Sequence, residues 1–353
     1  MKIPTLESIS CPMCRCSSAR EIQRLTDVLC GVPGVYTVCR CDDCGHLYMN
    51  PRPTEETLYL CYPSNYSPHL LLPEETTADS QNSQKAVPWY LQYLPLKRIP
   101  GLRAFYYWLM NDLGQPCPDE GNSGADSCGK RVFELGCSTG TYLMRLRSRG
   151  WIVEGVEPSA DASAVARQLG LNVHTGILDD VTLPPQTFDC AAAWMVLEHV
   201  PEPQVTLRQL YSLLKPGGQL LLSIPNFGCW EPHVFRSAWF IWEVPRHLHH
   251  FTPTSIRQLL QRVGFTDVSI QHQRNVFNLI CSLGIFLGRI PLCRRIGNRL
   301  LHYPEAPRLW IQILLSPLAH FLSAIRQGGR ITVRAQRAVE ENALAADSCK
   351  VEE

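Results

Sequence analysis

The sequence predicts an α/β protein with a mostly parallel β-sheet covered by helices on both faces. From residue 131 onward, short apolar runs alternate with amphipathic helical patterns, which is typical of successive β-α-β units. A turn containing two glycines joins the first apolar run to the first helical pattern. The composition agrees with a globular fold, because 45% hydrophobic and 18% charged residues in a chain of 353 exclude a disordered or fibrous protein.

The alternation can be followed element by element. Strands are expected at residues 131–135, 151–157, 171–175, 188–194, 219–225, 266–272 and 330–336. Helices are expected between them, at residues 141–150, 161–170, 203–214 and 254–264. The strand runs are short and apolar, whereas the helical segments space their apolar residues three or four apart.

Three segments depart from this alternation. Residues 51–127 form a linker rich in Pro, Ser and Asn, in which two aromatic stretches, 87–96 and 102–114, favour helices. Residues 276–328 form an apolar helical insertion with two 17-residue stretches that are short for a membrane span. We expect this insertion to form a lid or to rest on a membrane surface, with plain core packing as the alternative. Residues 329–338 supply the last core strand, and 339–353 a disordered tail.

Charge and the N-terminus narrow the class of protein. Lys and Arg number 33 and Asp and Glu 32, so no global charge favours binding to nucleic acid, and we expect no nucleic-acid partner. The N-terminus has no apolar run of the length that a signal peptide needs. We therefore expect a cytoplasmic protein with reduced or metal-bound thiols, and the insertion leaves peripheral membrane association open.

The head of the chain, residues 1–50, is rich in cysteine. It contains two CxxC pairs, Cys11 with Cys14 and Cys41 with Cys44, separated by 26 residues. Four thiolates suit tetrahedral zinc, and a site closed by four cysteines is structural, so we predict a zinc ribbon. A set of buried thiols is the alternative, and Cys16 or Cys39 could replace a ligand by a shift of register.

The glycine turn and the acids that follow it predict a ligand site. Gly136 and Gly140 permit a sharp turn and close approach of a ligand to the backbone, although their spacing is not that of the dinucleotide fingerprint. Glu157 ends the second strand, where a carboxylate commonly pairs with ribose hydroxyls. Ile177 and Leu178 follow the third strand and could pack on a base. A solvated Glu157 and an ordinary polar loop are the alternatives.

Four segments then resemble the class I S-adenosylmethionine-dependent methyltransferases. They are ELGCSTG, GVEPS, FDCAAAWMVLEHVPEP and LKPGGQLLLSIPN, within residues 128–272. The CPMC and CDDCGHLYMNPRP head resembles the zinc ribbon that precedes this domain in bacterial members, including sugar C-methyltransferases. The resemblance implies a Rossmann-like sheet of seven strands with the last antiparallel, a core domain at 128–275, and S-adenosylmethionine as the methyl donor.

The same resemblance assigns roles around the donor. It places the methionyl group at Gly136, Cys137 and Gly140, with Glu134 orienting the loop. It implies that Glu157 binds the ribose diol and that Ile177 and Leu178 cover the adenine. Trp194 would border the sulfonium, since an aromatic face suits a cation. The acceptor implied is a small molecule such as a sugar, a quinone-like compound or a lipid-linked intermediate.

Two histidine-containing segments are candidates for the acceptor side. His199 follows Glu198 in an LEH segment similar to that of quinone-pathway O-methyltransferases, which carry a further Glu where this chain has Met195. That departure weakens the case for metal assistance, and His199 is either a catalytic base or a hydrogen-bonding loop residue.

The second segment is Arg246-His247-Leu248-His249-His250. Arg246 could hold an anionic substrate group and His247 or His250 could take a proton, whereas metal binding or helix capping is the alternative. Two other functions stay open at this point. One is a non-catalytic scaffold that keeps the cofactor fold, and the other is a nicotinamide-dependent oxidoreductase, which the glycine spacing disfavours.

Overall fold

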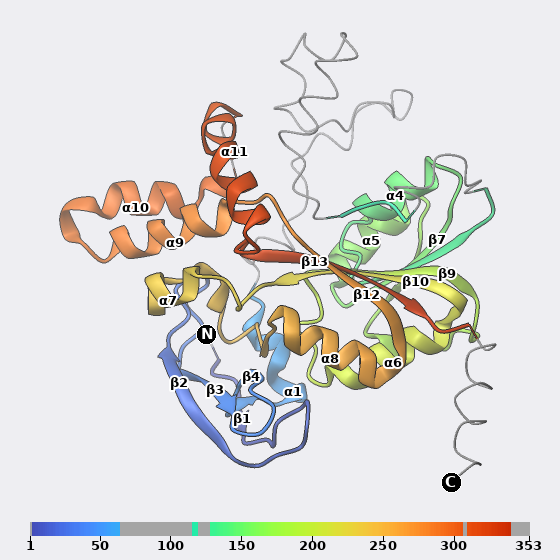
Figure 1. Cartoon of the computed structure of the whole chain (residues 1–353), viewed down its shortest axis with the longest axis horizontal. Coiled ribbons are helices and arrows are strands. Elements are labelled where there is room, and N and C mark those ends of the chain that lie inside the picture. Colours follow the sequence, from blue (N-terminus) through green and yellow to red (C-terminus); the bar gives the residue numbers. More distant parts are fainter. Residues whose placement is uncertain (1, 64–114, 119–127, 306–308, 340–353) are drawn as a thin grey trace.

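The computed structural model describes residues 2–63, 115–118, 128–305 and 309–339 (Figure 1). The two aromatic stretches predicted as helices, 87–96 and 102–114, and the predicted tail from residue 340 lie outside the described residues.

A seven-stranded sheet forms the centre of the molecule, with the strand order β12-β13-β10-β9-β6-β7-β8. Its strands are β6 (Arg131–Leu135), β7 (Ile152–Glu157), β8 (Asn172–Thr175), β9 (Phe188–Trp194), β10 (Leu214–Pro225), β12 (Phe265–His272) and β13 (Arg330–Arg337). The pairs from β10 to β8 are parallel, and β13 runs antiparallel to both of its neighbours. The predicted Rossmann-like sheet with an antiparallel last strand is confirmed.

Helices cover both faces of this sheet. Helices α4 (Thr141–Arg147) and α5 (Ala160–Gln168) lie on one face, and α6 (Pro203–Leu213) and α8 (Pro253–Val263) lie on the other (Figure 1). Successive strand residues point to opposite faces. Within β9, Ala191 and Ala193 accordingly join the core beneath α6 and α8, while Cys190 and Ala192 join the core beneath α4. A sheet buried on both faces explains why the strand runs are continuously apolar.

Strand β10 begins earlier than predicted, at Leu214 and not at residue 219. Helix α6 passes directly into the strand, and the pairing with β9 shifts register between Leu214 and Gln219. Gly217, with φ of 75°, lies inside the shift, so a turn-like KPGG segment is accommodated within a strand.

The N-terminal ribbon shares a sheet with the large domain. Its strands are β1 (Leu6–Glu7), β2 (Ala19–Leu25), β3 (Tyr36–Cys41), β4 (Leu47–Met49) and β5 (Arg52–Pro53), followed by α1 (Glu55–Leu58) and η1 (Tyr59–Cys61). The four-stranded sheet β11-β4-β3-β2 takes β11 (His249–His250) from the far part of the chain. His249 pairs with Tyr48 and His250 with Leu47. The ribbon and the segment around His249 therefore form one structural unit.

A buried ion pair strengthens this junction. Asp27 of the ribbon accepts hydrogen bonds from both terminal nitrogens of Arg246, each at 2.9 Å, and both side chains are almost fully buried. Burial alone would raise the pKa of Asp27, but the bonds from Arg246 outweigh it and lower the pKa below its usual value. The guanidinium also donates to the carbonyl of Cys61. Arg246 therefore joins the ribbon to the core, which corrects the expectation that it holds an anionic substrate group.

The insertion at 276–328 contains a helix that the sequence did not reveal. Its elements are α9 (Phe277–Gly288), η7 (Pro291–Cys293), α10 (Arg294–Leu301), η8 (Tyr303–Glu305) and α11 (Leu309–Ala324). The insertion projects from one end of the sheet, beside α7 (Glu231–Phe235) (Figure 1). Within the described ranges, no helix combines the length and the apolar character needed to cross a bilayer.

Candidate active site

A glycine loop occupies the point where the strand order reverses, at the carboxyl end of β6. Gly136 and Gly140 have φ of 68° and 81°, in the left-handed region that favours glycine. A Cβ on Gly136 would lie 2.5 Å from Cγ2 of Val196, and one on Gly140 would overlap the side chain of Leu171. Both positions therefore require glycine, and the crevice beside β6 and β9 is where such sheets bind ligands.

Glu157, at the end of β7, braces this loop. Its Oε2 accepts from the backbone N–H of Ser138 at 2.8 Å, and its Oε1 accepts from the N–H of Ser159 at 2.9 Å. Ser138 itself has a positive φ of 50°. The carboxylate is 4% exposed and uses one lone pair of each oxygen in these bonds. Each oxygen keeps a second lone pair, which suits a pair of hydroxyl donors.

Two buried polar atoms near the carboxyl ends of β6 and β9 have no partner among the described residues. One is Oε2 of Glu134, and the other is the indole Nε1 of Trp194 at the end of β9. Burial raises the pKa of Glu134 well above its usual value, and Glu157 adds to the increase. The ring of Trp194 packs edge-on against Tyr142, with centroids 4.9 Å apart. Unpartnered buried groups are costly, so these two atoms indicate a polar ligand.

The third loop follows β8 as the short helix η4 (Leu178–Asp180). Asp180 accepts from the backbone N–H of Ile177 at 2.9 Å, so it closes the turn and does not point away as a free acceptor. Ile177 is 53% exposed, whereas Leu178 is buried. The loop thus offers one accessible apolar side chain at the carboxyl edge of the sheet.

Glu198, His199 and His247 meet beyond the carboxyl end of β9. Each offers one ligand atom, and these three atoms lie within 4.8 Å of one another. Both carboxylate oxygens of Glu198 lack a hydrogen-bond partner in the described part of the chain, and burial raises its pKa to about 8. Burial lowers the pKa of His199 and of His247 to about 3, so both imidazoles are neutral at pH 7.

The hydrogen bond of His247 fixes which of its ring nitrogens carries the free lone pair. Nδ1 of His247 donates to the carbonyl of Ile241 at 2.9 Å, so its Nε2 carries the lone pair. That Nε2 lies 3.5 Å from a carboxylate oxygen of Glu243. Nδ1 of His199 bonds the hydroxyl of Tyr62 at 3.1 Å, with the roles set by the tautomer. Carboxylates and neutral imidazoles together are the donor set of a transition-metal site.

The remaining histidines have different surroundings. His250 is buried between Trp242 and Phe227, and its Nε2 has no partner among the residues that the structure describes. His249 donates from Nε2 to the carbonyl of Val200 at 3.0 Å, and its Nδ1 lies 3.3 Å from Nε2 of His46. His249 is thus structural, linking the ribbon to the loop after His199.

Sequence reasoning found His199 and His247 but missed Tyr62, Glu243 and the convergence itself. Tyr62 follows η1 in a segment treated as linker, and Glu243 lies in an aromatic run. Neither carries a local pattern that marks it. The LEH segment indicated Glu198 as a possible metal ligand. Because Met195 stands where quinone-pathway enzymes have a further Glu, the sequence did not indicate a third ligand, which the structure supplies as His247.

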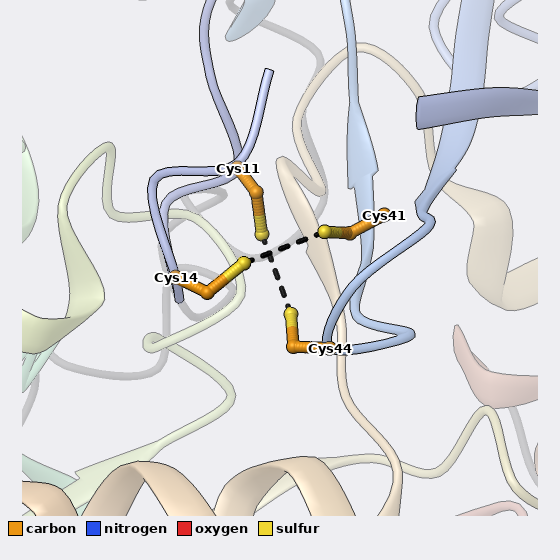
Figure 2. Close-up of side chains that lie close together, drawn as sticks. All are labelled: Cys11, Cys14, Cys41 and Cys44. Carbon is orange, nitrogen blue, oxygen red and sulfur yellow. Dashed lines mark hydrogen bonds between the residues drawn. The ribbon is translucent and has the colours of Figure 1, made fainter. Parts of the chain in front are cut away.

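The four predicted cysteines converge in the ribbon (Figure 2). Sγ of Cys11 lies 3.6 Å from Sγ of Cys44, and Sγ of Cys14 lies 3.4 Å from that of Cys41. Tetrahedral zinc with bonds of about 2.3 Å places its sulfurs about 3.8 Å apart, so the spacing fits zinc. Burial opposes ionisation of Cys41, but the N–H groups of Cys44 and Asp43 outweigh it and lower the pKa of Cys41 to about 7.

Comparison with known proteins identifies the class. The family model for a methyltransferase domain matches residues 110–270. A ubiquinone biosynthesis O-methyltransferase of Coxiella burnetii (strain RSA 493 / Nine Mile phase I) is 36% identical over 168 residues, which cover 43% of this chain and 72% of the relative. The chain therefore belongs to the S-adenosylmethionine-dependent methyltransferases.

Other relatives carry the same description. The ubiquinone biosynthesis O-methyltransferase of Klebsiella pneumoniae subsp. pneumoniae is 29% identical over 154 residues, covering 41% of this chain and 64% of the relative. Among solved structures, a Haemonchus contortus phosphoethanolamine N-methyltransferase 2 is similar with a TM-score of 0.42 and 16% identity, covering 70% of this chain and 60% of that one. A Thermotoga maritima methyltransferase has a TM-score of 0.41 at 16% identity, covering 69% and 98%.

Proposed function

We propose that this enzyme methylates a hydroxyl oxygen of a phenolic, quinone-like small molecule. The observation that carries the proposal is the cluster of Glu198, His199 and His247, which gathers a buried carboxylate and two neutral imidazoles beside the donor crevice. Such a cluster acts on a weakly acidic O–H group, because a phenol must lose its proton to become a good nucleophile. The name of the 36% identical relative supports an O-acceptor of this type.

On the donor side, the assignment follows the resemblance. Gly136, Cys137 and Gly140 would hold the methionyl group, and Glu134 would complete its polar surroundings. Glu157 would accept from the ribose hydroxyls, and Trp194 would face the sulfonium. Ile177 would cover the adenine, whereas Leu178, predicted for the same role, is buried in the core and does not reach a ligand. The unpartnered Oε2 of Glu134 and the left-handed glycines fit this ligand. S-adenosylmethionine supplies the methyl group and leaves as a neutral thioether, so the protein mainly aligns the reactants and excludes water.

On the acceptor side, we assign Glu198, His199 and His247 to a divalent cation. Two imidazoles and one carboxylate suit a transition ion, and the low pKa values keep both imidazoles in the form that binds metal. A cation held there would lower the pKa of an acceptor hydroxyl. His250, with its unpartnered Nε2, is the remaining candidate to accept the hydroxyl proton, although burial lowers its pKa well below the usual value.

In the ribbon, we assign structural zinc to Cys11, Cys14, Cys41 and Cys44. Four sulfurs leave no open coordination position, so this ion would hold the ribbon together and take no part in methyl transfer. Because the ribbon sheet includes His249 and His250, zinc would also support the acceptor loop.

Methyl transfer to a water-soluble catechol tests the proposed function. Glu198→Gln and His247→Ala should lower the rate at least a hundredfold while S-adenosylhomocysteine affinity stays within threefold, and His233→Ala, at an exposed histidine, serves as the control. Metal analysis should find a second divalent ion besides the ribbon zinc in the wild type, and the ribbon zinc alone in Glu198→Gln. Full activity of both variants would refute the acceptor site.

Calorimetry tests the donor side independently. S-adenosylhomocysteine should bind at micromolar concentration while NADH does not bind. A folded protein that binds the thioether but methylates no phenol, sugar or amine would favour the scaffold alternative. Binding of NADH alone would contradict the donor assignment.

A further inference from the structure

The helical insertion, residues 276–328, carries a large share of the exposed apolar surface. Of the 22 large apolar side chains that are exposed within the described residues, 11 lie in this insertion. Leu292 is 94% exposed, Leu314 68% and Trp310 59%. Exposed apolar side chains that are concentrated in one part of a folded protein mark an interaction surface.

This exposure remains after the insertion has formed its own core. Helices α9 and α10 pack with their backbones close, because a Cβ on Gly297 would overlap Gly288 and one on Gly284 would lie 2.6 Å from the backbone of Leu301. Ile280 and Tyr303 are buried in a cluster of the insertion itself. The exposed apolar side chains are therefore not part of the core of the insertion, and packing within the insertion does not explain why they are apolar.

The net positive charge of the insertion indicates which kind of partner would cover its exposed apolar side chains. Residues 276–328 contain six arginines and a single acid, Glu305, whereas the rest of the chain has more acids than bases. Arg294, Arg295 and Arg299 are exposed on α10, next to Leu292. A second copy of the chain would bring the same positive charge to the contact and be repelled. Apolar side chains alongside arginine match the acyl and headgroup regions of an anionic membrane.

We propose that the helical insertion docks this enzyme on the surface of an anionic phospholipid bilayer. The docking is peripheral, with the short helices lying in the interface. Helix α9 bonds to the segment that leads to His247, since Ser282 accepts from the N–H of Phe240 at 2.9 Å and Arg289 bonds Ser237. Docking therefore holds the acceptor side close to the lipid surface. Easier access to an apolar acceptor dissolved in the membrane would follow only if the proposed function is correct. The docking itself does not depend on the proposed function.

Vesicle flotation of the full chain tests the proposal. The wild type should float with vesicles of phosphatidylcholine and phosphatidylglycerol and much less with phosphatidylcholine alone. Leu292→Glu should weaken binding roughly tenfold or more, because a fully exposed leucine loses its burial in lipid. Arg294→Gln with Arg295→Gln should weaken it roughly fivefold per arginine, an effect that high salt removes. Val35→Glu is the matched control, since Val35 is a 59% exposed apolar residue of the ribbon and should leave binding unchanged.

The outcomes separate this proposal from the proposed function. Leu292→Glu should methylate a water-soluble catechol at the wild-type rate, because Leu292 is outside both sites. A wild type that fails to float, or Leu292→Glu floating as well as the wild type, would overturn the docking. A wild-type dimer that becomes monomeric in Leu292→Glu, with no vesicle binding, would overturn it in favour of self-association. Flotation without methylation of any phenol would refute the proposed function alone.

Discussion

The buried pair of Asp27 and Arg246 should contribute strongly to stability, because it joins two parts of the chain that are far apart in sequence. Asp27→Ala leaves the guanidinium buried, with the carboxylate of Glu243 still in contact at 3.4 Å. Removing one partner of a buried pair costs about 3–5 kcal/mol. That is a large fraction of the roughly 5–15 kcal/mol by which a typical domain is stable.

Urea unfolding followed by circular dichroism measures this loss. The control is Glu21→Ala, which removes an exposed ion pair with Arg24 and should cost at most about 0.5 kcal/mol. Replacing both Asp27 and Arg246 by leucine and methionine should recover part of the stability, because the guanidinium is no longer buried without Asp27. The N–H groups of Leu29, Cys30 and Val32, which donate to Asp27, would still lose their acceptor. A loss below about 1 kcal/mol for Asp27→Ala, or one equal to that of Glu21→Ala, would refute the reasoning.

Three further predictions concern the cofactor, the metal and pH. Glu157→Ala should weaken S-adenosylhomocysteine binding at least tenfold, about 1.4 kcal/mol, by calorimetry; unchanged affinity in a folded variant would contradict the ribose assignment. Metal analysis should find about one tightly bound zinc per chain that Cys44→Ser removes, and a folded, metal-free protein would contradict the ribbon assignment. Burial raises the pKa of Glu231 to about 7, although Trp239 donates to it at 2.9 Å. In the unfolded chain this carboxyl ionises at lower pH, so Glu231 alone should make the free energy of unfolding fall by on the order of 3 kcal/mol as pH rises from about 4.5 to 7. Glu231→Gln should remove that fall, and an identical pH profile in the variant would show that Glu231 is not its source.

The parts of the fold that local patterns encode were predictable. Each core strand is a continuous apolar run because both faces of the sheet are buried, and each covering helix has an apolar face. Gly136 and Gly140 mark a turn whose backbone conformation few other residues adopt. The two CxxC pairs are equally local, since two thiolates of one turn reach one metal. The fold class, the glycine turn at the edge of the sheet and the cysteine cluster could therefore be predicted from the sequence.

The contacts between distant segments were decided by the tertiary structure. Asp27 and Arg246 are 219 positions apart, and neither carries a pattern that indicates its partner. The same holds for His250, which pairs with Leu47 in the ribbon sheet, and for His247, which completes the cluster with Glu198. Such contacts depend on how the folded helices and strands pack against one another. Desolvation and steric fit act only where segments distant in sequence come into contact. The sequence by itself determined the sheet and the glycine turn at its carboxyl edge, whereas packing decided that Glu198, His199 and His247 come together.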